Sequence, residues 1–247
     1  MYNPDTETLE TLKIGNLRYI QPKCGYRFSI DALLLADFVN VKPDERILDV
    51  GTGSGILPLL IAALTPAREI LGLELQERLA QIARRNIILN ALENRIQIIE
   101  GDLRQVSRLF RAGSFDVLCS NPPYRRVGSG RINLEHEQAI ARHEIACSLR
   151  DLLAAWKYLV KPGGKVVVIY LPERLSELLT GLTLSRLEPK RLRCIHSDPH
   201  SSASLVLVEA QRDASPGLIV LPPLFLYTNT QEYSEEAQRI LHEKKDK

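Results

Sequence analysis

Residues 46–64 read RILDVGTGSGILPLLIAAL, and this stretch decides the fold class of the chain. A short strand-like run at 46–50 passes directly into three glycines with single residues between them, and an apolar helix-like segment follows. A strand, a glycine-rich loop and a helix in this order open a nucleotide-binding βαβ unit. The stretch therefore predicts an α/β fold with a ligand at the carboxyl end of its first strand.

Strand-like and helix-like segments alternate along the chain from residue 46 to residue 212, and a turn is expected at Pro162-Gly163-Gly164. The expected strands are 46–50, 69–74, 96–100, 115–120, 165–170, 187–196 and 204–212. The expected helices are 56–64, 76–92, 103–110, 144–159 and 173–182. The alternation implies a parallel sheet, and the last two strands, which follow one another without a helix, suggest an antiparallel pair.

Two flanking segments complete the chain. Residues 12–21 are β-like and broken by Gly15, and Ser29 is a plausible N-cap for a helix at 30–39. At the other end, an apolar stretch at 218–227 precedes a charged, helix-like tail. We expect three parts: a lid-like N-terminal extension (1–45) packed on the main domain, the main domain (46–212) and a C-terminal extension (213–247).

Composition narrows the class of protein. With 247 residues and 45% hydrophobic content the chain can bury a real core, while 32 basic against 30 acidic residues give no global argument for nucleic acid. The cysteines are widely spaced, which favours reduced thiols over disulfides or zinc: Cys24, Cys119, Cys147 and Cys194. The longest apolar run, 56–64, is too short to span a bilayer, so we expect a cytoplasmic protein without membrane insertion or a metal site.

The glycine loop excludes one class of ligand. Gly51, Gly53 and Gly55 form GxGxG, whereas the dinucleotide fingerprint requires a glycine at the position of Ile56, which disfavours a pyrophosphate ligand. A plain strand-to-helix turn is the alternative interpretation of the glycines alone.

Acidic residues stand at three successive strand ends. Asp49 and Glu74 close the first two strands and Asp102 follows the third, so all three should line one crevice at the carboxyl edge of the sheet. Each alone could be a helix cap or turn former. Together they fit a ligand with a ribose diol, an adenine amine and an ammonium group. S-adenosylmethionine matches that set.

The fourth strand runs into Asn121-Pro122-Pro123-Tyr124. The prolines stiffen the backbone, so that the Asn121 carboxamide oxygen and the Pro122 carbonyl could accept hydrogen bonds from one planar NH₂ group, with the Tyr124 ring as a wall. An ordinary proline-rich turn is the alternative for the motif by itself. Its place beside the acidic crevice favours an amine clamp.

These segments resemble a known family. Residues 48–55, Glu74, Gly101-Asp102 and the motif at 121–124 look like the successive motifs of Rossmann-like class I S-adenosylmethionine-dependent amino-methyltransferases. More narrowly, GYRFSIDALLLA at 25–36 and ARHE at 141–144 resemble the bacterial valine-tRNA adenine-N6 methyltransferase family. The resemblance covers about residues 25–212. It implies a mostly parallel seven-stranded sheet with helices on both faces.

The resemblance also implies roles. Asp102 would bind the adenine amine of the cofactor, Glu74 its ribose, and Asp49 with the glycine loop its methionine end. Asn121 and Pro122 would hold the reacting amine, Asn121 would also bind the cofactor, and Tyr124 would stack on the base. The implied reaction is N6-methylation of an adenine in RNA, in the first place the anticodon-loop adenosine of valine tRNA, with no obligate protein partner.

Other functions remain open at this stage. The same motif holds a carboxamide equally well, which allows a protein-glutamine N5-methyltransferase, although that type carries a helical domain before the glycine loop. Ribosomal-RNA guanine-N2 and DNA adenine-N6 methylation are further alternatives. A cofactor-binding or RNA-binding scaffold without catalysis is disfavoured by the intact acidic set and Asn121.

RNA contacts could come from basic side chains near the motif. The candidates are Arg125, Arg126, Arg131, Arg142 and His143. A second cluster, at 186–196, holds four cations with only Glu188 opposing them. Solvated surface charge is the alternative for both clusters, and His143 could simply be satisfied by Glu144 or backbone. Trp156 lies on an amphipathic helix and is expected in the core.

Overall fold

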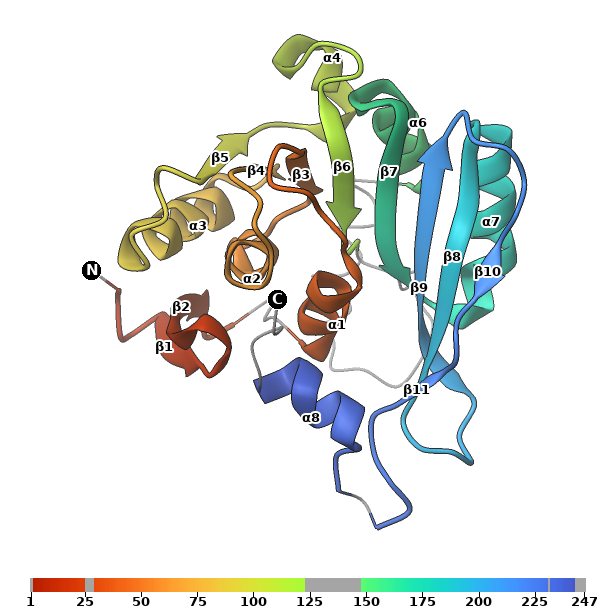
Figure 1. Ribbon diagram of the computed structural model, residues 1–247. Coiled ribbons are helices and arrows are strands. Elements are labelled where there is room, and N and C mark those ends of the chain that lie inside the picture. Colours follow the sequence, from red (N-terminus) through yellow and green to blue (C-terminus); the bar gives the residue numbers. More distant parts are fainter. Residues whose placement is uncertain (1, 25–28, 123–147, 231, 243–247) are drawn as a thin grey trace.

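The computed structural model describes residues 2–24, 29–122, 148–230 and 232–242, and it centres on one large β-sheet covered by helices on both faces (Figure 1). The principal strands lie in the spatial order β8-β9-β7-β6-β3-β4-β5. They are β3 (Arg46–Val50), β4 (Glu69–Glu74), β5 (Ile96–Glu100), β6 (Phe115–Ser120), β7 (Val160–Tyr170), β8 (Leu187–His196) and β9 (Ala203–Arg212). Only β9 runs antiparallel to its neighbours, which confirms the expected parallel sheet and terminal antiparallel pair.

Two further strands correct the expected number. The short β10 (Ile219–Val220) and β11 (Leu224–Phe225) pair in parallel with β8, so the described chain has nine strands in this sheet, not seven. A two-residue strand is too short to show alternation, which is why the sequence did not reveal them. Together they cover the open edge of β8, whose unpaired backbone groups would otherwise face solvent.

The helices form two layers. One layer holds α1 (Ile30–Phe38), α2 (Ile56–Leu64), α3 (Glu77–Leu89) and α8 (Glu235–His242). The other holds α4 (Val106–Leu109), α6 (Leu149–Leu159) and α7 (Leu175–Leu184). Successive strand residues alternate between the layers, as the pleat requires: Ile47 faces the first and Leu48 the second. Trp156 of α6, in the second layer, is fully buried in the core, as predicted.

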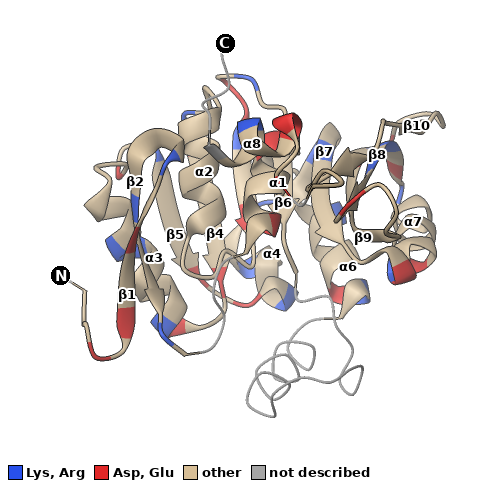
Figure 2. Ribbon diagram, turned by 90° about the horizontal axis from the view of Figure 1, so that it is seen from below, with Lys and Arg blue, Asp and Glu red and all other residues tan. Residues whose placement is uncertain are grey.

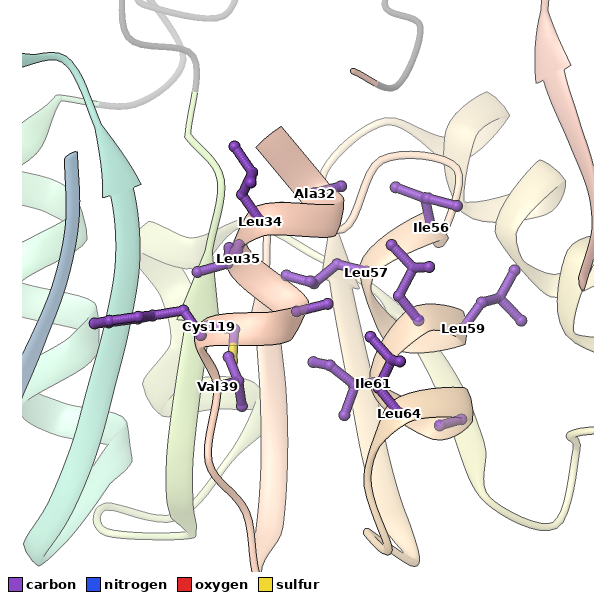
Figure 3. Packing of buried hydrophobic residues seen from close by; sticks show 14 of the residues in the cluster. Ala32, Leu34, Leu35, Val39, Ile56, Leu57, Leu59, Ile61, Leu64 and Cys119 are labelled. Atoms are coloured by element: carbon purple, nitrogen blue, oxygen red, sulfur yellow. The ribbon is translucent and has the colours of Figure 1, made fainter. Parts of the chain in front are cut away.

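The N-terminal segment is part of the first layer. Figure 3 shows α1 lying against α2, with Leu35 of α1 and Leu57 and Ile61 of α2 among the packed side chains. The same apolar cluster includes Ala237 of α8, so residues from both ends of the chain complete one core. Ser29 precedes α1 in extended conformation, as an N-cap does, but its side chain makes no capping hydrogen bond.

Before α1, two strands replace the single broken run that we expected. β1 (Glu7–Leu12) and β2 (Leu17–Pro22) form an antiparallel hairpin around a short 3₁₀ turn, Ile14–Asn16. Gly15 and Asn16 both take positive φ angles, 63° and 51°, which turn the chain sharply. The first strand reads ETLETL, a polar pattern that gave little sign of a strand.

The expected turn at 162–164 lies inside a strand. Val160 of β7 pairs with Phe115 and Lys165 pairs with Val117, so residues 161–164 form a bulge opposite the single residue Asp116. Gly163 has φ of +76°, and the turn chemistry was therefore identified correctly although the strand begins earlier. None of the described helices has the length and apolarity needed to cross a lipid bilayer.

Candidate active site

The glycine loop between β3 and α2 has three left-handed residues. Gly51, Gly53 and Gly55 have φ angles of 83°, 58° and 84°. The N–H groups of Gly51 and Thr52 donate to Leu73 O, at 2.9 and 3.0 Å, which ties the loop to β4. A methyl group added at Gly55 would lie 3.0 Å from Ala83 Cβ, whereas one at Gly51 would meet nothing within 4 Å. Gly55 thus serves packing, and Gly51 faces space that a ligand can use.

Two buried carboxylates lie beside the loop. Asp49 is 2% exposed and Glu74 is 5% exposed. Glu74 accepts hydrogen bonds from Gly53 N at 2.8 Å and from Gln76 N at 2.9 Å. Burial raises the pKa of Asp49 to about 7, the Thr52 hydroxyl opposes this and the charge of Glu74 adds to it. A buried pair of like charges suits a cationic ligand, which would remove their repulsion. The positive charges of S-adenosylmethionine fit this pair.

Asp102 lies at the next strand end. Gly101 N donates to Glu74 O at 2.8 Å, so the ends of β5 and β4 are joined. The Asp102 carboxylate caps the 3₁₀ turn Leu103–Gln105 by accepting from Arg104 N, and the Arg104 guanidinium pairs with it at 2.6 Å. This guanidinium is the main cause of the lowered pKa of Asp102. Asp102 therefore does act as a cap, and its carboxylate stays ionised at the crevice.

Asn121 and Pro122 follow β6 at the same edge of the sheet. Cys119 pairs with Asp49, and Ser120 Oγ donates to Val50 O at 2.8 Å, which fixes the end of β6 beside the start of the glycine loop. Pro122 is buried and Asn121 half-buried. Other predicted residues lie outside the described ranges: Tyr124, Arg125, Arg126, Arg131, Arg142 and His143.

Two residues that support the loop escaped the sequence analysis. Tyr19 of β2 is fully buried and its hydroxyl makes a hydrogen bond with Ser54 Oγ. Asn86 of α3, also fully buried, donates to Ser54 O at 2.9 Å and to Ile20 O at 2.8 Å, and accepts from Ile20 N at 2.7 Å. A carboxamide on the apolar face of α3 was the signal that could have pointed to Asn86.

The second basic cluster is engaged within the protein. Arg186 pairs with Asp213 and Arg191 with Glu209, both at 2.9 Å. Arg193 pairs with Glu236 of α8 at 2.8 Å, and Lys190 donates to a backbone carbonyl. The opposing acids come from β9, the chain after it and α8, not from Glu188. Figure 2 accordingly shows charges of both signs distributed around the described chain.

Comparison with known proteins gives three kinds of similarity. A family model described as "Methyltransferase small domain" matches residues 27–169. The chain is 30% identical to the "tRNA1(Val) (adenine(37)-N6)-methyltransferase" of Tolumonas auensis, over 90% of this chain and 85% of that one. The proteins of the same name from Porphyromonas gingivalis and Aeromonas salmonicida are 29% and 33% identical, over 89% and 64% of each pair of chains.

Solved structures share the fold at low sequence identity. A predicted O-methyltransferase from Agrobacterium tumefaciens has a TM-score of 0.70 at 22% identity, covering 87% of this chain and 97% of that one. TYW2 of P. horikoshii, solved in complex with MeSAdo, has a TM-score of 0.60 at 18% identity, covering 86% and 74%. The mostly parallel sheet with two helical layers is therefore an architecture that this chain shares with both solved structures.

Proposed function

The chain belongs to the methyltransferase small domain family, in the branch of the tRNA1(Val) (adenine(37)-N6)-methyltransferases, and we propose that it methylates N6 of an adenine in tRNA. S-adenosylmethionine is the methyl donor. The acceptor we propose is the anticodon-loop adenosine of valine tRNA, as the names of the relatives indicate. From this activity on tRNA we also infer a cytoplasmic location.

The observation that carries this proposal is the place of Asn121. It follows β6, which is paired with β3, and β3 leads into the glycine loop. A group held by the Asn121 carboxamide oxygen and the Pro122 carbonyl would therefore lie next to the space that Gly51 leaves open. This adjacency supports direct transfer between two ligands bound at one edge.

Methyl transfer to an adenine amine requires that the amine be positioned, and it does not require a strong general base. The cofactor supplies a methyl group on a positively charged sulfur, which is already a good leaving group. The exocyclic amine of adenine is a poor nucleophile because its lone pair is delocalised into the ring. By accepting both amine protons, Asn121 and Pro122 would favour a pyramidal nitrogen and aim its lone pair, and the proton can leave after transfer.

On the cofactor side, we assign the acids by their surroundings. Asp49, buried beside Glu74, would hold the ammonium group with the glycine loop. Glu74, which already accepts two backbone N–H groups, would accept the ribose hydroxyls, since carboxylate oxygens take more than one hydrogen bond. Asp102, kept ionised by Arg104, would accept from the adenine amine.

The deciding experiment uses S-adenosylmethionine with a labelled methyl group. Purified protein is incubated in turn with bulk tRNA, ribosomes, DNA and a release factor, and the products are digested and analysed. We expect N6-methyladenosine in tRNA alone, and a valine tRNA transcript with its anticodon-loop adenosine replaced by another base should accept no label.

Each alternative predicts another outcome of the same assay. Label on a glutamine of the release factor would establish protein methylation, and label in ribosomal RNA or DNA would move the substrate accordingly. Protein that binds S-adenosylmethionine but labels none of the four would establish a scaffold. The described residues before the glycine loop, 2–24 and 29–45, form one hairpin and one helix.

A further inference from the structure

A cavity of about 560 Å³ opens between two turns at the carboxyl end of β8. One is the β8–β9 turn, residues 197–202, and the other is the tail turn, the described residues 226–230 and 232–234 after β11. The described residues that line the cavity are Asp198, His200, Tyr227, Thr228 and Asn229. Its size is within the range of small-ligand pockets, about 300 to 1,000 Å³. Neither the catalytic nor the cofactor assignments use this cavity.

Both walls of the cavity are held in one shape. In the β8–β9 turn, Asp198 Oδ1 accepts from His200 N at 2.8 Å and from Ser201 N at 3.0 Å. In the tail turn, the rings of Tyr227 and Tyr233 stack with 4.8 Å between centroids. Tyr227 N donates to Ser197 O at 2.8 Å and so joins the two turns. The cavity is therefore preformed, which lowers the entropic cost of binding.

The lining chemistry suits a flat, neutral, hydrogen-bonding ligand. An aromatic ring, an imidazole, a hydroxyl and a carboxamide surround the space, and the one charge among the described lining residues is the carboxylate of Asp198. Neither lysine nor arginine is among those residues, which disfavours a phosphate. Aromatic and amide groups together are the means by which proteins hold unstacked nucleobases.

The cavity lies at the same edge of the sheet as Asn121. β8 and β6 are separated by β9 and β7, so at about 4.8 Å per strand they lie about 14 Å apart across the sheet. The strand pairings place Ser120 level with Leu192, so β8 runs four residues, about 13 Å, beyond the end of β6. The two strand ends therefore lie about 20 Å from each other. In Figure 1 the two turns extend beyond the edge toward which β6 runs. A nucleotide of the same loop, a few positions from the methylated adenine, can reach across this distance.

We propose that this cavity, between the β8–β9 turn and the tail turn, binds a second unstacked nucleobase of the RNA whose adenine is methylated. The proposal rests on the proposed function, since it needs a single-stranded RNA loop as substrate. It gives the C-terminal extension a role in substrate recognition, with Tyr227 as the central contact.

The test compares variants in steady-state methylation of an anticodon stem-loop RNA. Stacking on one base is worth about 1 to 3 kcal/mol, so Tyr227→Ala should raise the KM for RNA at least fivefold while kcat and cofactor affinity stay within about twofold. Tyr227→Phe, which keeps the ring, should restore most of the KM. Tyr2→Ala removes an exposed tyrosine before the N-terminal hairpin and is the matched control, with no expected effect.

A second measurement links the cavity to one base. Single abasic sites are placed around the loop, outside the methylated position, and each RNA is assayed with wild type and Tyr227→Ala. One abasic site should raise the KM of the wild type for RNA and leave the KM of Tyr227→Ala unchanged. Equal KM values for wild type and Tyr227→Ala, or equal losses at every abasic site, would overturn the cavity proposal alone. A wild type that methylates no RNA would overturn both proposals.

The KM of Tyr227→Ala reports on base binding only if the tail turn stays folded in the variant. Loss of the Tyr227–Tyr233 stack could loosen it, so His200→Ala and Asn229→Ala, both at exposed lining positions on the two walls, are measured as well. We expect each to raise the KM for RNA two- to fivefold without changing the thermal unfolding midpoint. Unchanged KM values for both would also contradict the proposal.

Discussion

The carboxyl edge of the sheet has two halves that are built differently. In the half that we propose binds the cofactor (the cofactor half), at the ends of β3, β4 and β5, Asp49, Ser54 and Glu74 are at most 5% exposed. In the half that we propose meets the RNA (the substrate half), from β6 to β8, Asn121 is half-buried and the cavity is lined largely by exposed residues. A small ligand that is contacted on all sides requires a buried site, whereas a large RNA can bind only at an open surface.

The cofactor half is also held from behind. Ser54 is bonded through its side chain to Tyr19 and through its carbonyl to Asn86, so β2 and α3 fix the loop. In the substrate half the corresponding bonds join two turns to each other. We therefore expect substitutions in the cofactor half to change cofactor affinity and folding, and substitutions in the substrate half to change RNA binding or methyl transfer.

The largest expected effect separates transfer from cofactor binding. Asn121→Ala removes one of the two proposed acceptors for the reacting amine, and loss of one such electrostatic contact typically lowers kcat by about 10² to 10³. Cofactor affinity, measured by isothermal titration calorimetry, should stay within about threefold. An equal collapse of both would show that Asn121 belongs to the cofactor half.

The next effect concerns charge in the cofactor half. Asp49→Asn should weaken S-adenosylmethionine binding roughly ten- to hundredfold at pH 8, as expected for loss of a charged hydrogen bond of about 1.5 to 3 kcal/mol. Because the pKa of Asp49 is about 7, wild-type affinity should fall as the pH is lowered through 7. The Asp49→Asn affinity should be flat there, and a parallel decline would contradict the assignment.

The buried Asp49 carboxylate should also lower the free energy of unfolding of the ligand-free protein. A pKa raised from 3.8 to about 7 means that the folded state holds the proton more tightly. The stability that this one group contributes is therefore fully present below its unfolded pKa and is lost as the pH rises from there through about 7. Ligand-free Asp49→Asn should therefore unfold at a higher temperature than wild type at pH 8. The difference should shrink toward pH 5, and a difference that grows instead would reverse the sign.

Substitutions at two glycines of the loop should distinguish a packing role from a ligand-binding role. Alanine at φ of +84° or +83° is strained by roughly 1 to 2 kcal/mol, so Gly55→Ala and Gly51→Ala should both lower the free energy of unfolding. Gly55→Ala should lose more, since its Cβ would press on Ala83. Gly51→Ala should lose more cofactor affinity. Identical stability losses in urea titrations would show that α3 yields to the added methyl group.

The smallest effect tests the support behind the loop. Tyr19→Phe removes the hydroxyl that meets Ser54, and a buried hydrogen bond of about 1 kcal/mol corresponds to a roughly fivefold weaker cofactor affinity, with kcat at saturation unchanged. Tyr158→Phe is the matched control, since its hydroxyl bonds to Phe110 O, before the start of β6. Equal cofactor affinities in the two variants would leave Tyr19 a purely structural residue.

The cofactor half was largely predictable, because its signals are local. A strand, a glycine loop and a helix stand next to each other in the sequence, and β3, β4, β5 and β6 carry strand patterns that end where the structure ends them. The supporting bonds were not predictable, because Tyr19 lies 35 residues from Ser54 and Asn86 lies 66 from Ile20. Sequence patterns show which side chains are buried and seldom which buried groups meet.

The substrate half was less predictable for the same reason. β10 and β11 are defined only by their pairing with β8, and the cavity exists only because the tail turn returns to the β8–β9 turn. The cations at 186–196 were correctly seen as a cluster, but their acidic partners Glu209, Asp213 and Glu236 are distant in the sequence.

The docking of α8 on α1 has a consequence for how the chain is made. Arg239 pairs with Asp37 at 3.6 Å and Ala237 is fully buried in the core that α1 shares. Roughly two hundred residues separate the two helices, and at about 5 to 20 residues per second a ribosome needs on the order of 10 to 40 s to add them. During that time α1 presents an uncovered apolar surface to the cell. We therefore expect a nascent chain of this protein to need a chaperone over α1 until α8 emerges from the ribosome.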